Sequence, residues 1–345
     1  MDALKDIGGP AQPLLTITGL VKHFPLKKDP LGRGGGVVRA VDGVDFEVLK
    51  GETLGVVGES GCGKSTTARL LMQLIAPTRG EVIFDGREVG GRELPLKEFR
   101  RQVQMVFQDS YASLNPRLTI EDSVAFGPQV HGVGRREAVA RARDLLARVG
   151  LEPQRFAERY PHELSGGQRQ RVNIARALAL QPRMVILDEA VSALDKSVEA
   201  QVINLLLDLK AEFGLTYLFI SHDLNVVRYV SDRVMVMYLG QVAEIGPADA
   251  LYDAPAHPYT RALLSSMPSM DPDHRTKQAA LAGDPPNPIN PPTGCRFHPR
   301  CAQAAPVCSR VVPEPIATGA RHAASCLVHE AGSGHPMAVP LARAA

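Results

Sequence analysis

The sequence predicts an α/β fold built on a parallel sheet, and three observations along the chain support it. Apolar and polar residues alternate over residues 11–56, which is typical of an antiparallel β subdomain. Short apolar runs then alternate with segments of helical periodicity, as parallel sheets require. After about residue 265 the composition changes to Pro, Ala, His and Cys. We therefore expect an α/β core with an N-terminal antiparallel subdomain, a helical subdomain and a small cysteine-rich C-terminal appendage.

Each predicted element follows from its local pattern. Thr53-Leu-Gly-Val-Val reads as a buried strand that enters a glycine-rich loop, and residues 65–75 have helical spacing. Residues 118–180 are rich in Ala, Arg and Leu, which predicts a helical insertion at about 110–180. Two further strands are expected at 184–187 and 216–220, on either side of a helix, and a hairpin is expected to turn near Gly240.

Composition and length limit the possible functions and the number of domains. The 345 residues contain 44% hydrophobic and 22% charged residues, enough for one large domain at 11–265 and a region at 266–330, followed by a disordered tail at 331–345. The net charge of +2 comes from 39 basic and 37 acidic residues, which argues against nucleic acid as a partner. Neither a signal peptide nor a run of about 18 apolar residues is present, so a cytoplasmic location is expected unless another protein holds the chain at a membrane.

The loop after the first buried strand has the pattern of a phosphate-binding loop. Its sequence is Gly58-Glu-Ser-Gly-Cys-Gly-Lys-Ser-Thr. Glycines let successive backbone N–H groups point at phosphates, Lys64 adds a positive charge, and the Ser65 hydroxyl is a magnesium ligand. The alternative is a simple glycine turn before a helix. We expect ATP to be bound by the loop residues Gly58, Ser60, Gly61, Cys62, Gly63, Lys64, Ser65 and Thr66.

Two carboxylates follow the next buried strand, Met184-Val-Ile-Leu. Asp188 is expected to hold Mg²⁺, and Glu189 to polarise the water that attacks ATP. An apolar strand that ends in Asp-Glu is a weak signal alone, but it is a strong one after a phosphate-binding loop. These residues predict an ATP hydrolase.

A second glycine-rich segment, Leu164-Ser-Gly-Gly-Gln-Arg-Gln, precedes a predicted helix. Ser165 is a good helix N-cap, and the bare amides of the following glycines form an end that binds phosphate. The alternative is an ordinary capped helix. This segment resembles the signature of ABC ATPases, and the resemblance implies that Ser165, Gly166, Gly167 and Gln168 contact ATP held by the opposite subunit of a head-to-tail dimer.

The resemblance to ABC ATPases covers nearly the whole chain and implies further site residues. Gln108 matches the Q-loop glutamine, which ligates magnesium and reports to the permease, and Ser192-Ala-Leu-Asp matches the D-loop. His222 matches the switch histidine near the γ-phosphate. Phe24 matches the aromatic residue that stacks on adenine, with a core position as the alternative. Ala190 and Val191 replace the Pro-Thr of many relatives, but neither change removes a charged or metal-binding group.

Segments that together cover about a fifth of the chain, most of them in the C-terminal region, resemble oligopeptide and dipeptide importer ATPases. The resemblance rests on the segments His257-Pro-Tyr-Thr-Arg-Ala-Leu, Asn290-Pro-Pro-Thr-Gly-Cys and Cys295-Arg-Phe-His-Pro-Arg-Cys, and on Lys22-His-Phe-Pro. It implies a peripheral protein at the cytoplasmic face of the inner membrane, paired with a paralogous ATPase, two permease subunits and an extracytoplasmic peptide-binding protein. Importers of nickel, glutathione or antibiotic peptides remain alternatives. So do, with less support, a lipid or drug exporter ATPase and a non-transport ABC ATPase.

Four cysteines fall in this region with the spacing C-x5-C-x6-C-x17-C, namely Cys295, Cys301, Cys308 and Cys326. In a reducing compartment such clustering favours a metal site over disulfides. Structural zinc sites usually open with a closer cysteine pair, so the spacing favours a [4Fe–4S] cluster, which the related importer ATPases also carry. Zn²⁺, with His298, His322 or His329 as substitute ligands, and free thiols are the alternatives.

Overall fold

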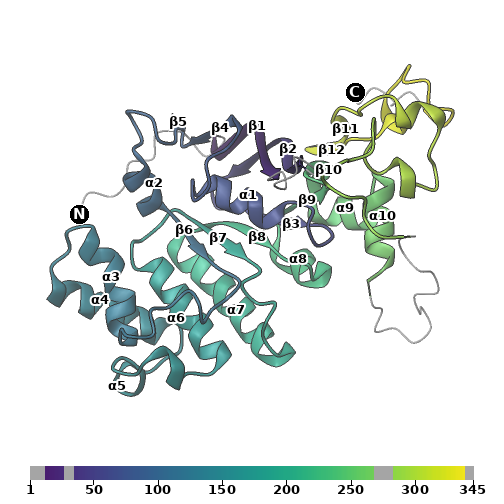
Figure 1. Cartoon of the computed structure of the whole chain (residues 1–345). Coiled ribbons are helices and arrows are strands. Elements are labelled where there is room, and N and C mark those ends of the chain that lie inside the picture. Colours follow the sequence, from purple (N-terminus) through teal and green to yellow (C-terminus); the bar gives the residue numbers. More distant parts are fainter. Residues whose placement is uncertain (1–11, 27–34, 268–282, 339–345) are drawn as a thin grey trace. The chain divides into compact units, whose positions relative to one another are not determined.

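The computed structural model describes residues 12–26, 35–267 and 283–338 (Figure 1). The chain forms two compact units, and in the described residues the first comprises 12–15, 48–53 and 83–221. The second comprises 16–26, 35–47, 54–82, 222–267 and 283–338. None of the helices in the described part of the chain combines the length and the apolar character that crossing a bilayer requires.

The first unit contains a parallel sheet of three strands, β6 (Val103–Val106), β7 (Met184–Asp188) and β8 (Thr216–Ile220). Val103 pairs with Met184, and Met184 pairs with Thr216. Every residue of β7 and β8 is buried, which explains their continuous apolar runs. The predicted strands at 184–187 and 216–220 are therefore confirmed.

Helices account for more of the first unit than strands do. Helices α3 (Ile120–Val130), α4 (Arg135–Arg148) and α6 (Gly166–Leu178) pack against one another through buried apolar faces, which confirms the expected helical subdomain. The remaining elements of the first unit are β5 (Arg87–Glu88), α2 (Leu96–Gln102), α5 (Pro153–Phe156), the 3-10 helix η1 (Pro161–Glu163) and α7 (Lys196–Phe213).

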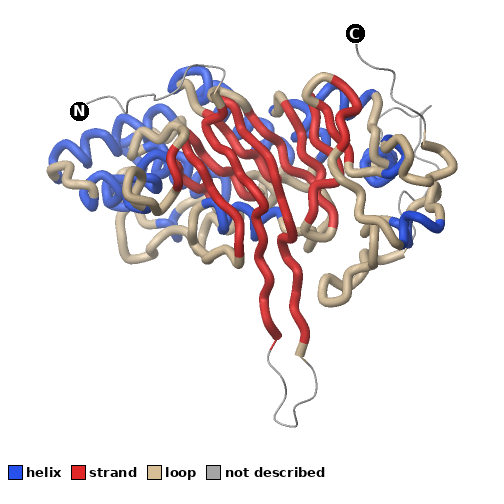
Figure 2. Tube along the Cα trace, turned by 90° about the horizontal axis from the view of Figure 1, so that it is seen from above, coloured by secondary structure: helices blue, strands red, loops and turns tan. Residues whose placement is uncertain are grey.

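The N-terminal β subdomain is built from β1 (Pro13–Leu26), β2 (Gly36–Leu49) and β4 (Arg79–Phe84), which lie in the order β2-β1-β4. Figure 2 shows β1 and β2 side by side as the two longest strands. The outer ends of these strands are exposed, whereas their alternating apolar residues near Leu20 and Val44 are fully buried. Most of the glycine-rich segment between them lies outside the described residues.

The second unit also holds a mixed sheet in which β3 (Thr53–Val57) is parallel to β9 (Arg233–Tyr238). Strand β10 (Gln241–Pro247) returns antiparallel to β9, so the predicted hairpin is confirmed, with its turn at Leu239 and Gly240. The other elements of this unit are α1 (Lys64–Leu71), α8 (Leu224–Val230), α9 (Ala248–Asp253), α10 (Pro258–Ser265), β11 (Ile316–Gly319), β12 (His322–Ala324) and the 3-10 helices η2 (His298–Arg300), η3 (Pro306–Ser309) and η4 (Leu327–His329).

The C-terminal region pairs with the sheet of the second unit, and the expected small cysteine-rich appendage is not confirmed. Strand β12 pairs antiparallel with β10, with Ala324 opposite Glu244, and β11 extends the same sheet. Residues 331–338 of the expected disordered tail form turns in which His335 Nε2 is 3.0 Å from the carbonyl oxygen of Gln303. Residues 339–345 lie outside the described part of the chain. The cysteine-rich region is thus continuous with the sheet that carries the glycine-rich loop.

Candidate functional site

The loop that links β3 to α1 has a backbone that only glycine can adopt at two positions. Gly58 has a φ of 147°, and a Cβ there would lie 2.2 Å from the carbonyl oxygen of Met237. Gly63 has a φ of 108°, and its Cβ would lie 2.3 Å from the carbonyl oxygen of Ala40. These contacts explain why the loop needs glycines at its first and last turns. The expected strand, loop and helix unit is present.

Lys64 is the first residue of α1, and its side chain folds back over this loop. Its Nζ donates hydrogen bonds to the carbonyl oxygens of Gly58 (2.7 Å) and Glu59 (3.1 Å). The residue is only 6% exposed, so the loop surrounds the ammonium group. Gly63, the N-cap of α1, provides no side-chain cap for the amides at the start of the helix. Burial raises the pKa of the Cys62 thiol, so Cys62 stays protonated inside the loop.

Phe24 lies near the end of β1 and is 36% exposed, far more than the fully buried Leu20 on the same strand. The Nζ of Lys22 lies 5.1 Å from the centre of the Phe24 ring. This exposure suits a ring that stacks on a ligand and does not suit the alternative of a core position.

The carboxylates of Asp188 and Glu189 stand where β7 ends. Asp188 is 3% exposed, and Glu189 follows with a φ of 49°, which is unusual for a residue with a side chain. Nε2 of Gln108 donates a hydrogen bond to Oε2 of Glu189 (2.9 Å), so the structure brings these two predicted residues together. Ser192, in the predicted D-loop, donates from Oγ to the carbonyl oxygen of Glu189 (2.9 Å). Glu189 is therefore held on both its side chain and its main chain.

Ser165 caps α6 as predicted. Its Oγ accepts a hydrogen bond from the N–H of Gln168 (3.3 Å), and Oε1 of Gln168 accepts one from the N–H of Ser165 (2.9 Å). A Cβ on Gly167 would lie 2.5 Å from Cγ1 of Val198, so close packing against α7 requires glycine there. Ser165 itself is exposed, as a residue that contacts a ligand or a second subunit must be.

Helix α6 also holds the segment that follows Gln108. Nδ2 of Asn173 donates to the carbonyl oxygen of Ser110 (3.0 Å), and Arg176 donates to the carbonyl oxygen of Ser113. The exposed ring of Tyr111 lies against the guanidinium of Arg169, with 5.4 Å between Cζ and the ring centre. The segment with Gln108 is thus connected to the helix that Ser165 caps.

His222 is exposed and directly precedes the α8 cap, where Asp223 accepts hydrogen bonds from the N–H groups of Asn225 (3.0 Å) and Val226 (3.3 Å). Its backbone is therefore next to a fixed turn. Ala190 and Val191, which replace Pro-Thr, are buried apolar side chains. This departure from the common pattern changes packing and not charge.

The four C-terminal cysteines line one cavity, together with Phe297, Leu327, His257, His298 and His335. All four are free thiols. Each sulfur accepts a backbone N–H: Phe297 to Cys295, Gln303 to Cys301, Ala305 to Cys308 and Val328 to Cys326. Burial raises the pKa of Cys295 to about 11 and also raises the pKa of Cys301 and Cys326. Among the described residues, no three Cys, His, Asp or Glu side chains are arranged as a group that could hold a metal ion.

The structure separates the three histidines that were considered as substitute metal ligands. Only His298 lines the cysteine cavity. His322 Nε2 is 2.7 Å from Oε1 of the fully buried Glu244, and His329 Nε2 is 3.0 Å from the carbonyl oxygen of Ala256. His335 also lines the cavity, although no sequence pattern singled it out.

Sequence reasoning also missed Glu59 of the glycine-rich loop and the two residues that contact it. The Glu59 carboxylate forms an ion pair with Arg300, and the Glu59 N–H donates to the hydroxyl of Tyr259. The only available signal was that Tyr259 and Arg300 fall in the segments that resemble importer ATPases. Sequence separations of 200 and 241 residues hide these contacts from any local pattern.

A strand, glycine-rich loop and helix unit within an α/β fold, with two carboxylates at the end of a parallel strand, defines the class of P-loop nucleotide-binding proteins. Residues 41–192 match the family model described as "ABC transporter". Residues 243–308 match the model "Oligopeptide/dipeptide transporter, C-terminal region". The second match begins inside β10 and includes three of the four cysteines.

Full-length relatives agree with these matches. The chain is 50% identical to the oligopeptide transport ATP-binding protein AppF of Bacillus subtilis, over 91% of this chain and 96% of that protein. It is 49% identical to the di/tripeptide transport ATP-binding protein DppF of Pseudomonas aeruginosa, over 87% of this chain and 93% of that protein. The chain therefore belongs to the ABC transporter family of ATP-binding proteins.

A solved structure shows the same fold. The ATP-binding cassette MJ0796, determined as a dimer bound to ADP and Pi, has a TM-score of 0.59 and 30% sequence identity to this chain. The match covers 68% of this chain and 98% of the MJ0796 chain. The α/β fold is thus that of an ABC ATPase.

Proposed function

We propose that this chain is the ATP-binding and ATP-hydrolysing subunit of an importer that takes up oligopeptides or dipeptides through a separate membrane permease. The observation that carries the proposal is that one chain contains both an ABC transporter region and an oligopeptide/dipeptide transporter C-terminal region. The two relatives, which are named for oligopeptide and for di/tripeptide transport, support the same substrate class. Import of nickel, glutathione or antibiotic peptides is the alternative.

The residues of the site would share the work of hydrolysis. The loop of Gly58, Ser60, Gly61, Cys62, Gly63, Lys64, Ser65 and Thr66 would bind the phosphates, and Phe24 would stack on adenine. The donors for Mg²⁺ would be Ser65, Gln108 and Asp188, an all-oxygen set that suits this ion, and bound Mg²⁺ would offset the phosphate charge.

Glu189 would accept a proton from the attacking water. Its hydrogen bond with Gln108 and its left-handed backbone fix the carboxylate in one orientation, as a general base requires. His222, on an exposed loop, would stabilise the charge that develops on the γ-phosphate.

The active form would be a head-to-tail dimer in which Ser165, Gly166, Gly167 and Gln168 contact ATP bound by the partner ATPase. The exposed cap of α6, with its free glycine amides, supports this role. We infer a heterodimer with a paralogous ATPase, two permease subunits and an extracytoplasmic peptide-binding protein. The complex would lie at the cytoplasmic face of the inner membrane, with this chain bound peripherally.

We also propose that Cys295, Cys301, Cys308 and Cys326 hold a [4Fe–4S] cluster, with Zn²⁺ as the alternative. Their shared cavity and the backbone N–H donated to each sulfur support this, because such hydrogen bonds stabilise metal-bound thiolates. The raised pKa values of Cys295, Cys301 and Cys326 keep these three thiols neutral without a cation. Because no group that could hold a metal is formed among the described residues, these side chains would have to rearrange on binding.

Purification of the tagged chain from native membranes, combined with uptake assays, tests the proposal. Two permease subunits and a second ATPase should copurify, and the complex in vesicles should accumulate labelled di- or oligopeptides only with ATP. Copurification of ribosomes or DNA, or ATP-dependent uptake of Ni²⁺ or glutathione in place of peptides, would contradict it.

A further inference from the structure

Glu59, the residue after the first glycine of the phosphate-binding loop, is held at two points by residues from the C-terminal part of the chain. Its carboxylate oxygens accept two hydrogen bonds from the Arg300 guanidinium, with Nη1 to Oε2 at 2.7 Å and Nη2 to Oε1 at 3.0 Å. Its backbone N–H donates to the hydroxyl of Tyr259 in α10 (2.9 Å). This bidentate geometry is the strongest form of an Arg–carboxylate pair.

The Arg300 side chain is itself fixed and shielded from water. It is 5% exposed, against 22% for Glu59. Nη2 also donates to the carbonyl oxygen of Gly283 (3.0 Å), and the guanidinium lies 6.0 Å from the centre of the Tyr238 ring. Tyr238 in turn packs against Tyr259, with 4.6 Å between the ring centres. Water screens an ion pair at this depth only weakly. Losing one of its two partners therefore costs more free energy than it would in a surface pair.

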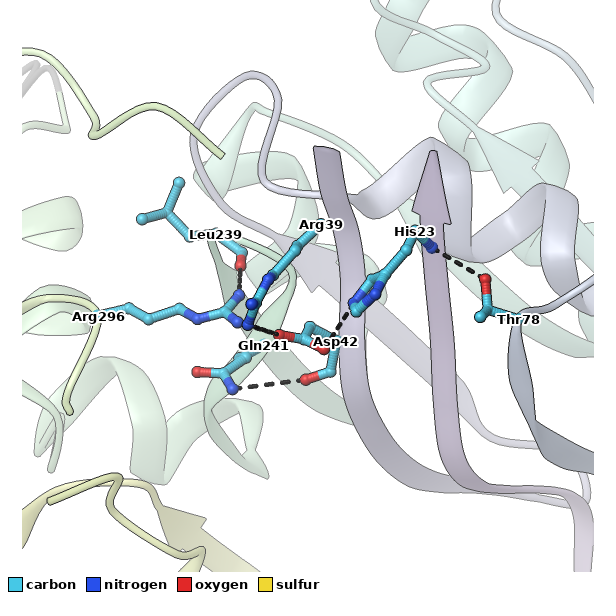
Figure 3. Close-up of polar contacts among 7 residues, drawn as sticks. All are labelled: His23, Arg39, Asp42, Thr78, Leu239, Gln241 and Arg296. Atoms are coloured by element: carbon cyan, nitrogen blue, oxygen red, sulfur yellow. Dashed lines mark hydrogen bonds and ion pairs between the residues drawn. The ribbon is translucent and has the colours of Figure 1, made fainter. Parts of the chain in front are cut away.

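A second arginine of the same C-terminal segment makes a comparable ion pair elsewhere (Figure 3). Arg296 donates to the Asp42 carboxylate and to the carbonyl oxygen of Leu239. Asp42 Oδ1 also lies 2.8 Å from His23 Nε2, so this network joins β1, β2 and the turn after β9. Arg296 therefore anchors the C-terminal segment to Asp42 and to the turn after β9, whereas Arg300 bonds a side chain of the phosphate-binding loop itself.

Because Glu59 is negatively charged, its contact with Arg300 is expected to affect ATP binding. A carboxylate in a loop that must receive a polyphosphate is repelled by that ligand, unless a cation offsets its charge. Arg300 provides this cation, and Lys64 approaches Glu59 only at its backbone carbonyl oxygen. We propose, given the ATP site inferred above, that Arg300 is a positioning residue through which the cysteine-bearing C-terminal segment sets the affinity of the phosphate-binding loop for ATP.

Calorimetric titration of the full-length chain with Mg-ATP tests this proposal. Arg300→Ala should weaken binding about tenfold, because it leaves the Glu59 charge uncompensated beside the phosphates. Glu59→Gln removes both the charge and the need for its partner, so it should weaken binding less. Adding Arg300→Ala to the Glu59→Gln variant should then cause almost no further loss of Mg-ATP affinity. If Arg300 had a purely structural role, Glu59→Gln would not restore the ATP affinity of the Arg300→Ala variant, because the Arg300–Glu59 contact is lost in both backgrounds.

The control is Arg310→Ala, which removes an exposed arginine from the same region and should bind ATP like the parent. In the assembled transporter, Arg300→Ala should raise KM and leave kcat within about twofold, because Arg300 acts through Glu59. Should Arg300→Ala fail to fold, Arg300→Lys, which keeps the charge without the bidentate pair, should bind at an intermediate affinity. The proposal would be overturned if Arg300→Ala bound Mg-ATP with the affinity of the parent. It would also be overturned if Arg300→Ala lost the same affinity with and without Glu59→Gln. Failure of the parent itself to bind ATP would instead overturn the proposed function.

Discussion

The side-chain amide of Gln108 donates a 2.9 Å hydrogen bond to the Glu189 carboxylate, and this contact joins the loop after β6 to the end of β7. Strands β6 and β7 are parallel neighbours, so their carboxyl ends lie on the same edge of the sheet. Glu189 also has a positive φ, which costs about 1–3 kcal/mol unless its surroundings compensate. A strained backbone at the end of a parallel strand supports a functional role for this carboxylate.

Replacing Glu189 with Gln should therefore abolish turnover and spare binding. The amide is almost the same size and leaves the phosphate-binding loop intact, but it does not accept a proton from water at neutral pH. We expect kcat to fall at least about 100-fold, while Mg-ATP affinity stays within about threefold. Steady-state hydrolysis by the assembled transporter and calorimetric titration measure the two quantities. Hydrolysis near the parent rate would show that Glu189 is not the base.

Lys64→Ala should show the opposite pattern. Lys64 is buried against the loop, where its Nζ bonds the carbonyl oxygens of Gly58 and Glu59. Its removal deletes both a charge for the phosphates and two contacts that hold the loop, so Mg-ATP affinity should fall at least about tenfold. Titration of the purified chain checks this, with thermal unfolding to confirm that the variant is folded. Unchanged affinity would overturn the assignment of the loop.

The segment Gln108–Pro116 should meet the permease. Asn173 and Arg176 of α6 hold the carbonyl oxygens of Ser110 and Ser113, so a displacement of α6 would also move this segment. Tyr111, at 52% exposure, offers an apolar contact. A cysteine at Ser113 should crosslink to cysteines in the cytoplasmic loops of the permease, and the yield should change between ATP-free and ATP-bound states. Repeated failure in an otherwise active complex would contradict the prediction.

Local patterns predicted the core of this fold, since the apolar runs of β7 and β8 and the glycines of the loop each reflect a constraint within a few residues. The Ser165 cap was predictable for the same reason. The pairing of β12 with β10 and the contact between Arg300 and Glu59 were not, because they join residues far apart in sequence. The expected small cysteine-rich appendage is not confirmed, because composition changes after about residue 265 while the sheet continues through β12.

The cysteine cavity leads to the last prediction, which concerns metal content. The four thiols share one cavity, and each sulfur accepts a backbone N–H. Burial raises the pKa of Cys295, Cys301 and Cys326, so thiolates at these three positions need a cation beside them. Protein purified without oxygen should be brown and should contain iron and acid-labile sulfide. Both should be lost in the Cys301→Ser, Cys308→Ser double variant.

Cys62 provides the matched control for this experiment, because it is a buried thiol of the phosphate-binding loop and is not among the residues that line the cysteine cavity. Cys62→Ser should keep the iron and the colour. Metal binding should also raise the temperature of unfolding, since the bound metal stabilises the folded state by mass action. Colourless anaerobic protein with stoichiometric zinc would exclude the cluster and favour the alternative, and protein with neither metal would leave the four cysteines as free thiols. Loss of iron in the Cys62 variant alone would place the cluster outside the cavity.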